Sequence, residues 1–341
     1  MGREAEILEG RDGPIRLSVI VPCFNEQEVV ELTFGRLVEV LGERDDINLE
    51  LVFVDDGSKD ETFSILESKL GGVTDLRLIK LSRNFGHQMA VTAGLENASG
   101  DVIAIIDADL QDPPEVILEM IDEWRKGFNI VYGIRAQRKE SMPIKLAYKL
   151  YYRILQKIAS IDIPLDSGDF CVMDRQAVQA LNSLPEKNRY VRGLRAWLGF
   201  EQKGIVYMRP ARSAGESKYS MFDLVRLAVD GVVNFSVFPL SLIAALGLAT
   251  SVVSIFAGIF YIVMWVTDFA LLGGVTKEAA GFTSIILAIF FFGGTQLFSL
   301  GIIGQYLGRM YIEIKRRPNY IVEQKLGFTG AASASADQTD G

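Results

Sequence analysis

Two aspartates, Asp107 and Asp109, directly follow a short apolar run in the segment Val102–Pro114. The run is rich in β-branched residues, which predicts a buried strand. If the strand continued, both carboxylates would point to the same side. Close carboxylates repel each other unless a cation lies beside them, and Mg²⁺ and Mn²⁺ prefer oxygen ligands. Asp107, Asp109 and Gln111 are therefore candidate metal ligands, although a strand that ends in a plain polar turn has the same spacing.

The chain around this segment alternates strands with helices, which predicts an α/β domain with a mostly parallel sheet and right-handed crossovers. Ligands bind beyond the carboxyl ends of the strands in such sheets. Polar side chains follow four of the expected strands, so we expect them to meet at one edge. Strands are expected at 17–22, 49–54, 76–81, 102–106 and 129–133, and the polar clusters are Asn25-Glu26, Asp55-Asp56, Arg83-Asn84 and Asp107-Ala108-Asp109.

The composition narrows the chemistry. A net charge of −8 argues against a nucleic-acid-binding protein. The single histidine, His87, rules out a His-cluster zinc site, and a Ser-His-Asp triad would have to use it. The chain has no G-x-G-x-x-G after its first strand and no P-loop, so a dinucleotide site of the Rossmann type is not expected. The sequence still allows a nucleotide to bind through carboxylates and a metal.

Two long stretches in the second half of the chain contain no charged residue, 231–267 and 279–308. Each exceeds the roughly 20 apolar residues that cross a bilayer, so we place membrane spans near 236–264 and 281–307. Basic residues precede the first span and follow the second, which predicts that both ends lie in the cytoplasm. Glycines in the second span indicate close helix packing, which favours a homo-oligomer.

Two amphipathic segments precede the spans. In 143–160, Lys145, Lys149, Arg153 and Lys157 recur every four residues opposite an apolar face. The segment 221–235 is a second amphipathic helix. Both are expected to lie in the membrane interface, and an ordinary surface helix is the alternative for the first.

Several motifs together resemble those of family 2 glycosyltransferases with the GT-A fold. They are Val21-Pro22-Cys23-Phe24-Asn25-Glu26, Val54-Asp55-Asp56-Gly57-Ser58, Arg83-Asn84-Phe85-Gly86-His87 and Asp107-Ala108-Asp109-Leu110-Gln111-Asp112-Pro113-Pro114. The motif Arg212-x-x-Gly215-x-Ser217-Lys218-Tyr219 and the two spans make the whole order similar to polyprenyl-phosphate glycosyltransferases, especially bactoprenol glucosyltransferases and dolichyl-phosphate mannose synthases. Processive relatives carry Q-x-x-R-W, which the stretch 192–197 does not match.

The resemblance implies roles for individual residues. The residues implied to bind the nucleotide are Pro22, Phe24, Asn25, Glu26, Asp55, Asp56, Arg83 and Asp107. The residues implied to bind the diphosphate together with Mg²⁺ or Mn²⁺ are Asp107, Asp109 and Gln111. Phosphate or acceptor contacts fall to Arg212, Ser217 and Lys218, and the catalytic set is Asp109, Asp166, Asp169, Arg212 and Lys218. His87 is expected to be structural.

The implied architecture is a membrane-bound enzyme. It comprises an N-terminal extension (1–15), a cytoplasmic GT-A catalytic domain (16–220, including the interfacial helix 143–160), a juxtamembrane helix (221–235), two transmembrane helices (236–308) and a basic cytoplasmic tail with a disordered end (309–341). The implied reaction is inverting transfer of one hexose, with glucose from UDP-glucose favoured, to undecaprenyl phosphate at the inner membrane. There are two alternatives. The enzyme could use GDP-mannose or a modified UDP-sugar as its donor, or the protein could be a catalytically inactive membrane scaffold.

Overall fold

The computed structural model describes residues 11–72, 75–136, 167–187, 189–208, 238–267 and 277–328. They fall into two compact units. The first unit contains a β-sheet with its helices and takes in the described residues from Arg317 onward, and the second contains two long helices. The expected helices at 143–160 and 221–235 lie outside the described residues, as do Asp166, Arg212, Ser217 and Lys218.

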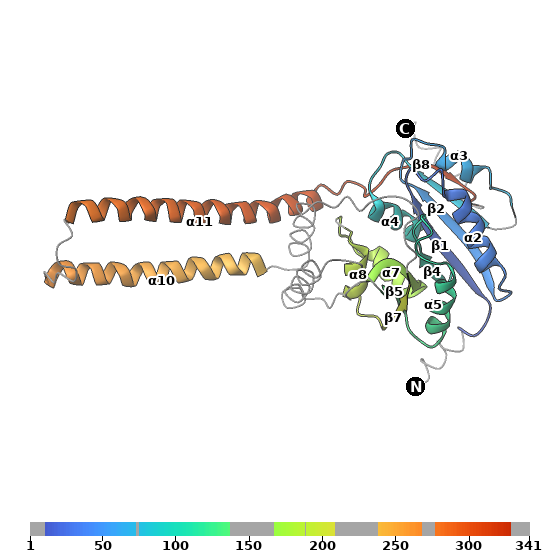
Figure 1. The fold of residues 1–341 in the computed structure, drawn as a ribbon, viewed down its shortest axis with the longest axis horizontal. Helices are drawn as coiled ribbons and strands as arrows, with labels where there is room; N and C mark the ends of the chain where they lie inside the picture. The colour runs from blue at the N-terminus through green and yellow to red at the C-terminus, as the bar shows by residue number, and fades with distance from the viewer. Residues whose placement is uncertain are drawn as a thin grey trace, which may run out of the picture. The chain divides into compact units, whose positions relative to one another are not determined.

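Within its described residues, the first unit is built on an eight-stranded sheet in the order β7-β5-β6-β4-β1-β2-β3-β8 (Figure 1). Its strands are β1 (Ile15–Cys23), β2 (Ile47–Asp55), β3 (Asp75–Leu81), β4 (Val102–Ile105), β5 (Ile130–Arg135), β6 (Ser167–Asp174), β7 (Gln202–Tyr207) and β8 (Val322–Leu326). Pairing is parallel except where β6 and β8 join the sheet. The expected α/β fold with a mostly parallel sheet is therefore confirmed. The central strands β1 and β2 are apolar along most of their length because helices cover both of their faces.

Helices pack on both faces of the sheet. One hydrophobic cluster joins it to α2 (Val30–Gly42), α3 (Thr62–Glu67) and α5 (Glu115–Arg125). The other joins it to α4 (His87–Asn97), α7 (Arg175–Ser183) and α8 (Val191–Trp197). The two faces are thus covered by different helices.

Strand β8 was not anticipated from the sequence, which suggested only a basic tail there. It pairs antiparallel with β3, and the Ser82 N–H donates to the Ile321 carbonyl at 2.9 Å. Tyr320 donates to Glu96, and Gly327 takes a left-handed φ of 80° against the Leu76 carbonyl. The segment after the second long helix therefore belongs to the sheet of the first unit.

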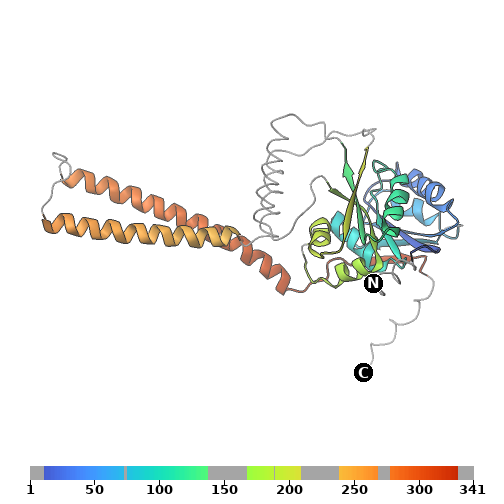
Figure 2. The same cartoon turned by 90° about the horizontal axis from the view of Figure 1, so that it is seen from below.

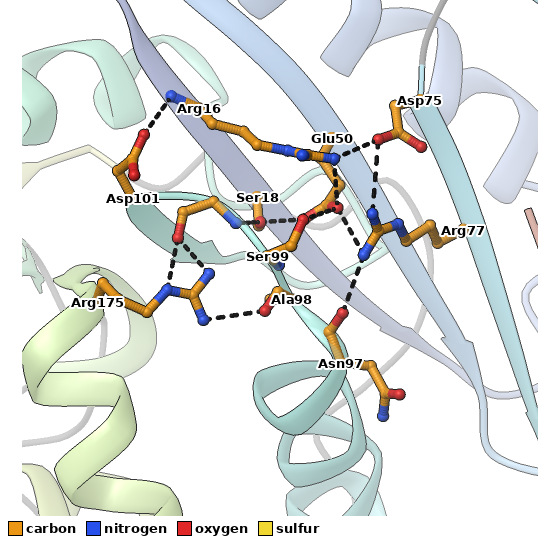
Figure 3. A network of polar contacts seen from close by, with 11 residues as sticks. Arg16, Ser18, Glu50, Asp75, Arg77, Asn97, Ala98, Ser99, Asp101 and Arg175 are labelled. Atoms are coloured by element: carbon orange, nitrogen blue, oxygen red, sulfur yellow. Dashed lines mark hydrogen bonds and ion pairs between the residues drawn. The ribbon is translucent and has the colours of Figure 1, made fainter. Parts of the chain in front are cut away.

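A buried polar network joins the amino ends of β1, β2 and β3 (Figure 3). Glu50 is fully buried and accepts hydrogen bonds from Ser18 Oγ, from Ser99 N at 2.9 Å and from Ser99 Oγ at 2.6 Å. The guanidinium groups of Arg16 and Arg77 lie 3.2 and 2.8 Å from its Oε1. These contacts offset the cost of burying a carboxylate. The network lies at the opposite end of the strands from the polar clusters singled out above.

The second unit consists of α10 (Phe238–Thr267) and α11 (Lys277–Ile314), which run side by side (Figures 1 and 2). Each holds a segment long and apolar enough to cross a membrane, Phe238–Phe256 and Ala288–Ile314, and neither segment is buried within the protein. Both helices fall where spans were predicted. Helix α11 extends beyond the predicted limits of 281–307 at both ends.

Candidate active site

The chain after β1 is fixed to the turn after β2. Asn25 has a left-handed φ of 54°, which asparagine tolerates better than most residues. Its backbone N–H donates to Ser58 Oγ at 2.9 Å, and its side-chain Oδ1 accepts from the Lys59 N–H at 2.9 Å. The Glu26 N–H donates to Thr62 Oγ1 at 2.9 Å. These bonds hold the residues after β1 against the turn that follows β2, and α2 begins only after them, at Val30.

Asp55 is the buried carboxylate at the end of β2. Its Oδ1 accepts from the N–H of Ser58 at 3.1 Å and from the Ser58 hydroxyl. Among the described residues, no donor reaches its Oδ2, although the residue is only 1% exposed. Burial raises the pKa of Asp55 even though Ser58 donates to it. A buried acceptor without a partner is costly, so this oxygen is suited to an N–H donor from a ligand.

Asp56 anchors the loop that follows β3. It accepts hydrogen bonds from the N–H groups of Phe85 at 2.7 Å and Gly86 at 2.8 Å. Gly57 has a φ of 71°, and a Cβ there would lie 2.5 Å from the carbonyl carbon of Arg83. The two loops are therefore in close backbone contact. Asp56 holds their arrangement, and its predicted contact with a nucleotide stays a prediction.

The segment from Asp107 to Pro114 leaves the sheet at the end of β4 as an irregular turn in which Leu110 has a φ of 53°. Asp109 Oδ1 accepts from the Gln111 N–H at 3.1 Å. Burial raises the pKa of Asp107, and the charges of Asp112 and Asp109 add to this while His87 opposes it. Burial also raises the pKa of Glu26, to which Asp109 and Asp107 contribute. Acidic groups at two strand ends therefore influence each other through their charges.

These acids fit a divalent cation that is shared with a substrate. Close carboxylates whose mutual repulsion raises their pKa values gain from a nearby cation. In the part of the chain that the structure describes, no group of three or more acidic, histidine or cysteine side chains forms a complete cation cage. Mg²⁺ typically takes only one or two protein carboxylates and completes its shell with substrate phosphates and water. The carboxylates of Asp107 and Asp109 have the chemistry for such a site, and their role as metal ligands, with Gln111, stays a prediction.

Asp169 lies inside β6 and is held by three side chains. Gln88 Nε2 donates to it at 2.9 Å, Arg192 Nε at 3.0 Å, and His87 Nε2 lies 3.3 Å from its Oδ2. Burial alone would raise the pKa of Asp169, but the hydrogen bond from His87 and the charge of Arg192 hold it well below its usual range. His87 Nε2 is also 3.8 Å from Asp107 Oδ1. The histidine expected to be structural therefore lies within the candidate site, between two of its carboxylates.

Two side chains that hold the segment from Asp107 to Pro114, here called the acidic turn, were not predicted from the sequence. Thr33 of α2 donates to the Ala108 carbonyl at 2.6 Å, and Tyr207 of β7 donates its hydroxyl hydrogen to Asp112. Arg135, the last residue of β5, donates from Nε to the Tyr207 oxygen at 3.4 Å. A tyrosine at the end of a short, half-buried strand gives no local signal of such a contact, because its partner lies 95 residues away.

The other predicted site residues divide into two groups. Pro22 belongs to β1, Phe24 is partly exposed, and Arg83 stacks its guanidinium 4.0 Å from the centre of the Phe85 ring. All three lie at or next to the carboxyl ends of β1 and β3. Asp166, Arg212, Ser217 and Lys218 lie outside the described residues, so their predicted roles stay predictions.

Comparison with known proteins gives the family that the sequence motifs resemble. The family model "Glycosyl transferase family 2" matches residues 18–181. The chain is 42% identical over 315 residues to an uncharacterised glycosyltransferase of Bacillus subtilis, YkcC, covering 92% of this chain and 95% of that protein. It is 37% identical over 314 residues to the bactoprenol glucosyl transferase of Shigella phage SfV, covering 91% and 99%. Among solved structures, glucosyl-3-phosphoglycerate synthase from Mycobacterium tuberculosis matches with a TM-score of 0.45 at 19% identity, covering 66% of this chain and 80% of that one.

This chain therefore belongs to glycosyl transferase family 2. Its α/β sheet is of the GT-A type and is followed by two apolar helices. It is a glycosyltransferase related to the bactoprenol glucosyl transferases.

Proposed function

We propose that the protein transfers a single glucose from UDP-glucose to a polyprenyl phosphate, undecaprenyl phosphate, at the cytoplasmic face of the inner membrane. The observation that carries this proposal is that the chain combines two features: an acidic carboxyl edge of the sheet with a buried acceptor, Asp55 Oδ2, that no described donor reaches, and a pair of helices long and apolar enough to cross a membrane. A water-soluble donor and a lipid-borne acceptor require those two surfaces. The relationship to bactoprenol glucosyl transferases favours glucose as the sugar and bactoprenol as the lipid.

The reaction needs positioning and charge compensation more than a strong base. The acceptor phosphate is already anionic near pH 7, so it can attack the sugar C1 directly and invert the anomeric centre. Asp107, Asp109 and Gln111 would hold Mg²⁺ or Mn²⁺, which when bound stabilises the leaving diphosphate. Arg212, Ser217 and Lys218 would contact the phosphates, and Asp166 and Asp169 would face the sugar or acceptor.

The partner-free oxygen of Asp55 favours a uracil base. Uracil presents one ring N–H between two carbonyls, whereas guanine presents a ring N–H and an amino group side by side. Since Ser58 occupies one oxygen of Asp55, a single acceptor is left for the base. We therefore expect UDP to bind more tightly than GDP, and Asp55→Asn to weaken UDP binding. Equal affinities of the wild type for UDP and GDP would contradict this expectation, and tighter binding of GDP would favour the mannose-transferring alternative.

The position of β8 supports a hairpin topology. The strands before α10 and the strand after α11 belong to one sheet. If both helices span the bilayer, the chain must return to the side that it left. This agrees with the basic residues beside the spans, which favour the cytoplasm for both ends.

The glycine face of α11 supports a homo-oligomer. Gly294, Gly301 and Gly308 recur at every seventh position, and nothing lies within 4 Å of a Cβ built on any of them. Small residues at helical spacing allow close approach of a second membrane helix.

The test is a panel of nucleotide sugars assayed with purified protein, Mg²⁺ or Mn²⁺, and undecaprenyl phosphate. We expect UDP release and a glucosylated lipid with UDP-glucose, and neither with the Asp109→Ala variant. Transfer only from another donor would replace the sugar assignment. No transfer from any donor by a folded wild type would favour the scaffold alternative.

A further inference from the structure

The segment from Asp107 to Pro114 carries the candidate metal ligands, yet neither a helix nor a strand fixes it. It leaves the sheet after Ile105 and contains a residue with left-handed φ, Leu110. Such a backbone keeps one shape only where surrounding groups determine it. The position of Asp107 and Asp109 therefore depends on side chains outside the turn.

One of these side chains is Tyr207, the last residue of β7. Its ring contacts Phe170 edge to face with the ring centres 5.4 Å apart, and it lies over Gly133, where a Cβ would be 2.6 Å from Tyr207 Cε1. The residue is only 5% exposed. The ring is thus fixed by packing from β5 and β6, and its hydroxyl is presented at one place.

The hydroxyl of Tyr207 links two charged groups. It donates to Asp112 Oδ1 and accepts from Arg135 Nε at 3.4 Å, while Arg135 Nη2 is 3.9 Å from Asp112 Oδ2. Asp112 is 1% exposed. The three side chains come from the acidic turn, from the end of β5 and from the end of β7. Burying charged groups is costly even when they are paired, and an apolar trio would typically stabilise such a junction equally well. Stability alone therefore does not account for these three polar side chains.

From this geometry, and resting on the proposed function, we propose that Tyr207 is a positioning residue for glycosyl transfer. Its hydroxyl fixes Asp112, and through it the turn that carries Asp107 and Asp109. The same hydroxyl aligns the guanidinium of Arg135 with that turn at the carboxyl edge of the sheet. The role assigned to Tyr207 is indirect, since it acts through Asp112 and Arg135 and does not itself contact substrate.

The variant Tyr207→Phe removes the hydroxyl and keeps the ring that packs on Phe170. We expect the turnover rate with UDP-glucose to fall about ten- to hundredfold, the range for one hydrogen bond to a charged group. We also expect the Mn²⁺ concentration for half-maximal rate to rise about tenfold, because the candidate ligands lose their alignment. The matched control is Tyr132→Phe, whose ring lies under the Arg195 guanidinium and keeps that contact. It should change neither quantity more than about twofold.

A double-mutant cycle tests whether the hydroxyl acts through Asp112. If it does, Tyr207→Phe combined with Asp112→Asn should lose little more activity than Asp112→Asn alone. Fully additive losses would contradict the assignment. So would a Tyr207→Phe variant that has a lower midpoint of thermal unfolding but, at temperatures where it is folded, the wild-type rate and Mn²⁺ requirement.

Calorimetric binding of UDP with Mn²⁺ separates this proposal from the proposed function. If the wild type binds UDP and Mn²⁺ but transfers no sugar, the proposed function fails, and weaker binding by Tyr207→Phe than by Tyr132→Phe still supports the positioning role. If the wild type transfers glucose and both variants match it in rate and binding, the positioning role fails alone. A wild type that neither transfers sugar nor binds UDP with Mn²⁺ removes both proposals.

Discussion

Replacing Glu50 with glutamine should destabilise the first unit without affecting donor binding. Glu50 is fully buried at the amino ends of the strands, where Ser18 and Ser99 donate to it and Arg16 and Arg77 supply positive charge. Glutamine has nearly the same shape. It is neutral, however, and its amide N–H₂ would face donors instead of acceptors.

The magnitude follows from the contacts that change. Breaking a buried ion pair by removing one charge typically costs about 3–5 kcal/mol. Here the amide oxygen of glutamine can still accept from one serine, and Arg16 is about a third exposed and can be solvated, with a side-chain exposure of 37%. Arg77, at 14%, cannot be solvated as readily. We therefore expect a loss of about 2–4 kcal/mol in the free energy of unfolding.

Urea unfolding in detergent measures this loss, followed by the fluorescence of Trp124, which is buried in the first unit. The control is Glu39→Gln, which alters an exposed pair with Arg36 on one turn of α2 and should leave the urea midpoint close to that of the wild type. The Michaelis constant for UDP-glucose should be unchanged in both variants, since the network lies at the opposite end of the strands. A Glu50→Gln variant within 0.5 kcal/mol of the wild type would refute the reasoning.

The pH dependence gives a second check on the same network. Burial alone would raise the pKa of Glu50, but the hydrogen bonds from Ser18 and Ser99 and the charge of Arg77 lower it. A lowered folded pKa means that the ionised carboxylate contributes stability above the unfolded value of about 4.3 and loses it as the pH falls through the folded value. The difference in stability between the wild type and Glu50→Gln should therefore narrow below about pH 4. A difference that widened on acidification would contradict the sign.

Three further variants test other parts of the protein. Asp109→Ala should abolish UDP release while the protein stays folded and membrane-bound, and near-normal activity would remove Asp109 from the metal site. Lys218→Ala should raise the Michaelis constant for the polyprenyl phosphate, and unchanged acceptor kinetics would count against its phosphate contact. Gly327→Ala should lower the unfolding free energy by about 1–3 kcal/mol more than Gly71→Ala, because both glycines have a φ of 80° but only Gly327 lies against a carbonyl, that of Leu76. Equal losses from the two glycine variants, measured by urea unfolding, would show that this close contact does not hold β8.

The sequence predicted the features whose signal is local. Apolar runs bounded by polar clusters located the parallel strands, and the rule that ligands bind at their carboxyl ends placed Asn25, Asp55 and Asp107 at one edge. The structure confirms the sheet, and the charges of Asp107 and Asp109 do reach Glu26. Length and composition sufficed for the two apolar helices.

Features that depend on contacts between distant segments were not predictable in this way. Strand β8 is short, and its middle residues Glu323, Gln324 and Lys325 are exposed, so it has no apolar pattern. The stretch Asp166-Ser167-Gly168-Asp169 has the composition of a polar turn, yet Asp169 lies within β6, which pairs with β5 as far as Ser167. The contact between His87 and Asp169 joins residues 82 positions apart and has no signature in either neighbourhood.

The placement of β8 also sets an order for biosynthesis. This strand is translated after both apolar helices, so the ribosome must make all of α10 and α11 before β3 can gain its last neighbour. Until then β3 is an open edge, the kind of surface on which nascent chains aggregate. Asp75, Arg77 and Lys80 alternate along it with apolar residues, and such charges keep an unpaired edge soluble. If α10 and α11 insert into a membrane as they are made, that insertion precedes completion of the sheet, so the eight-stranded sheet is completed only at the membrane.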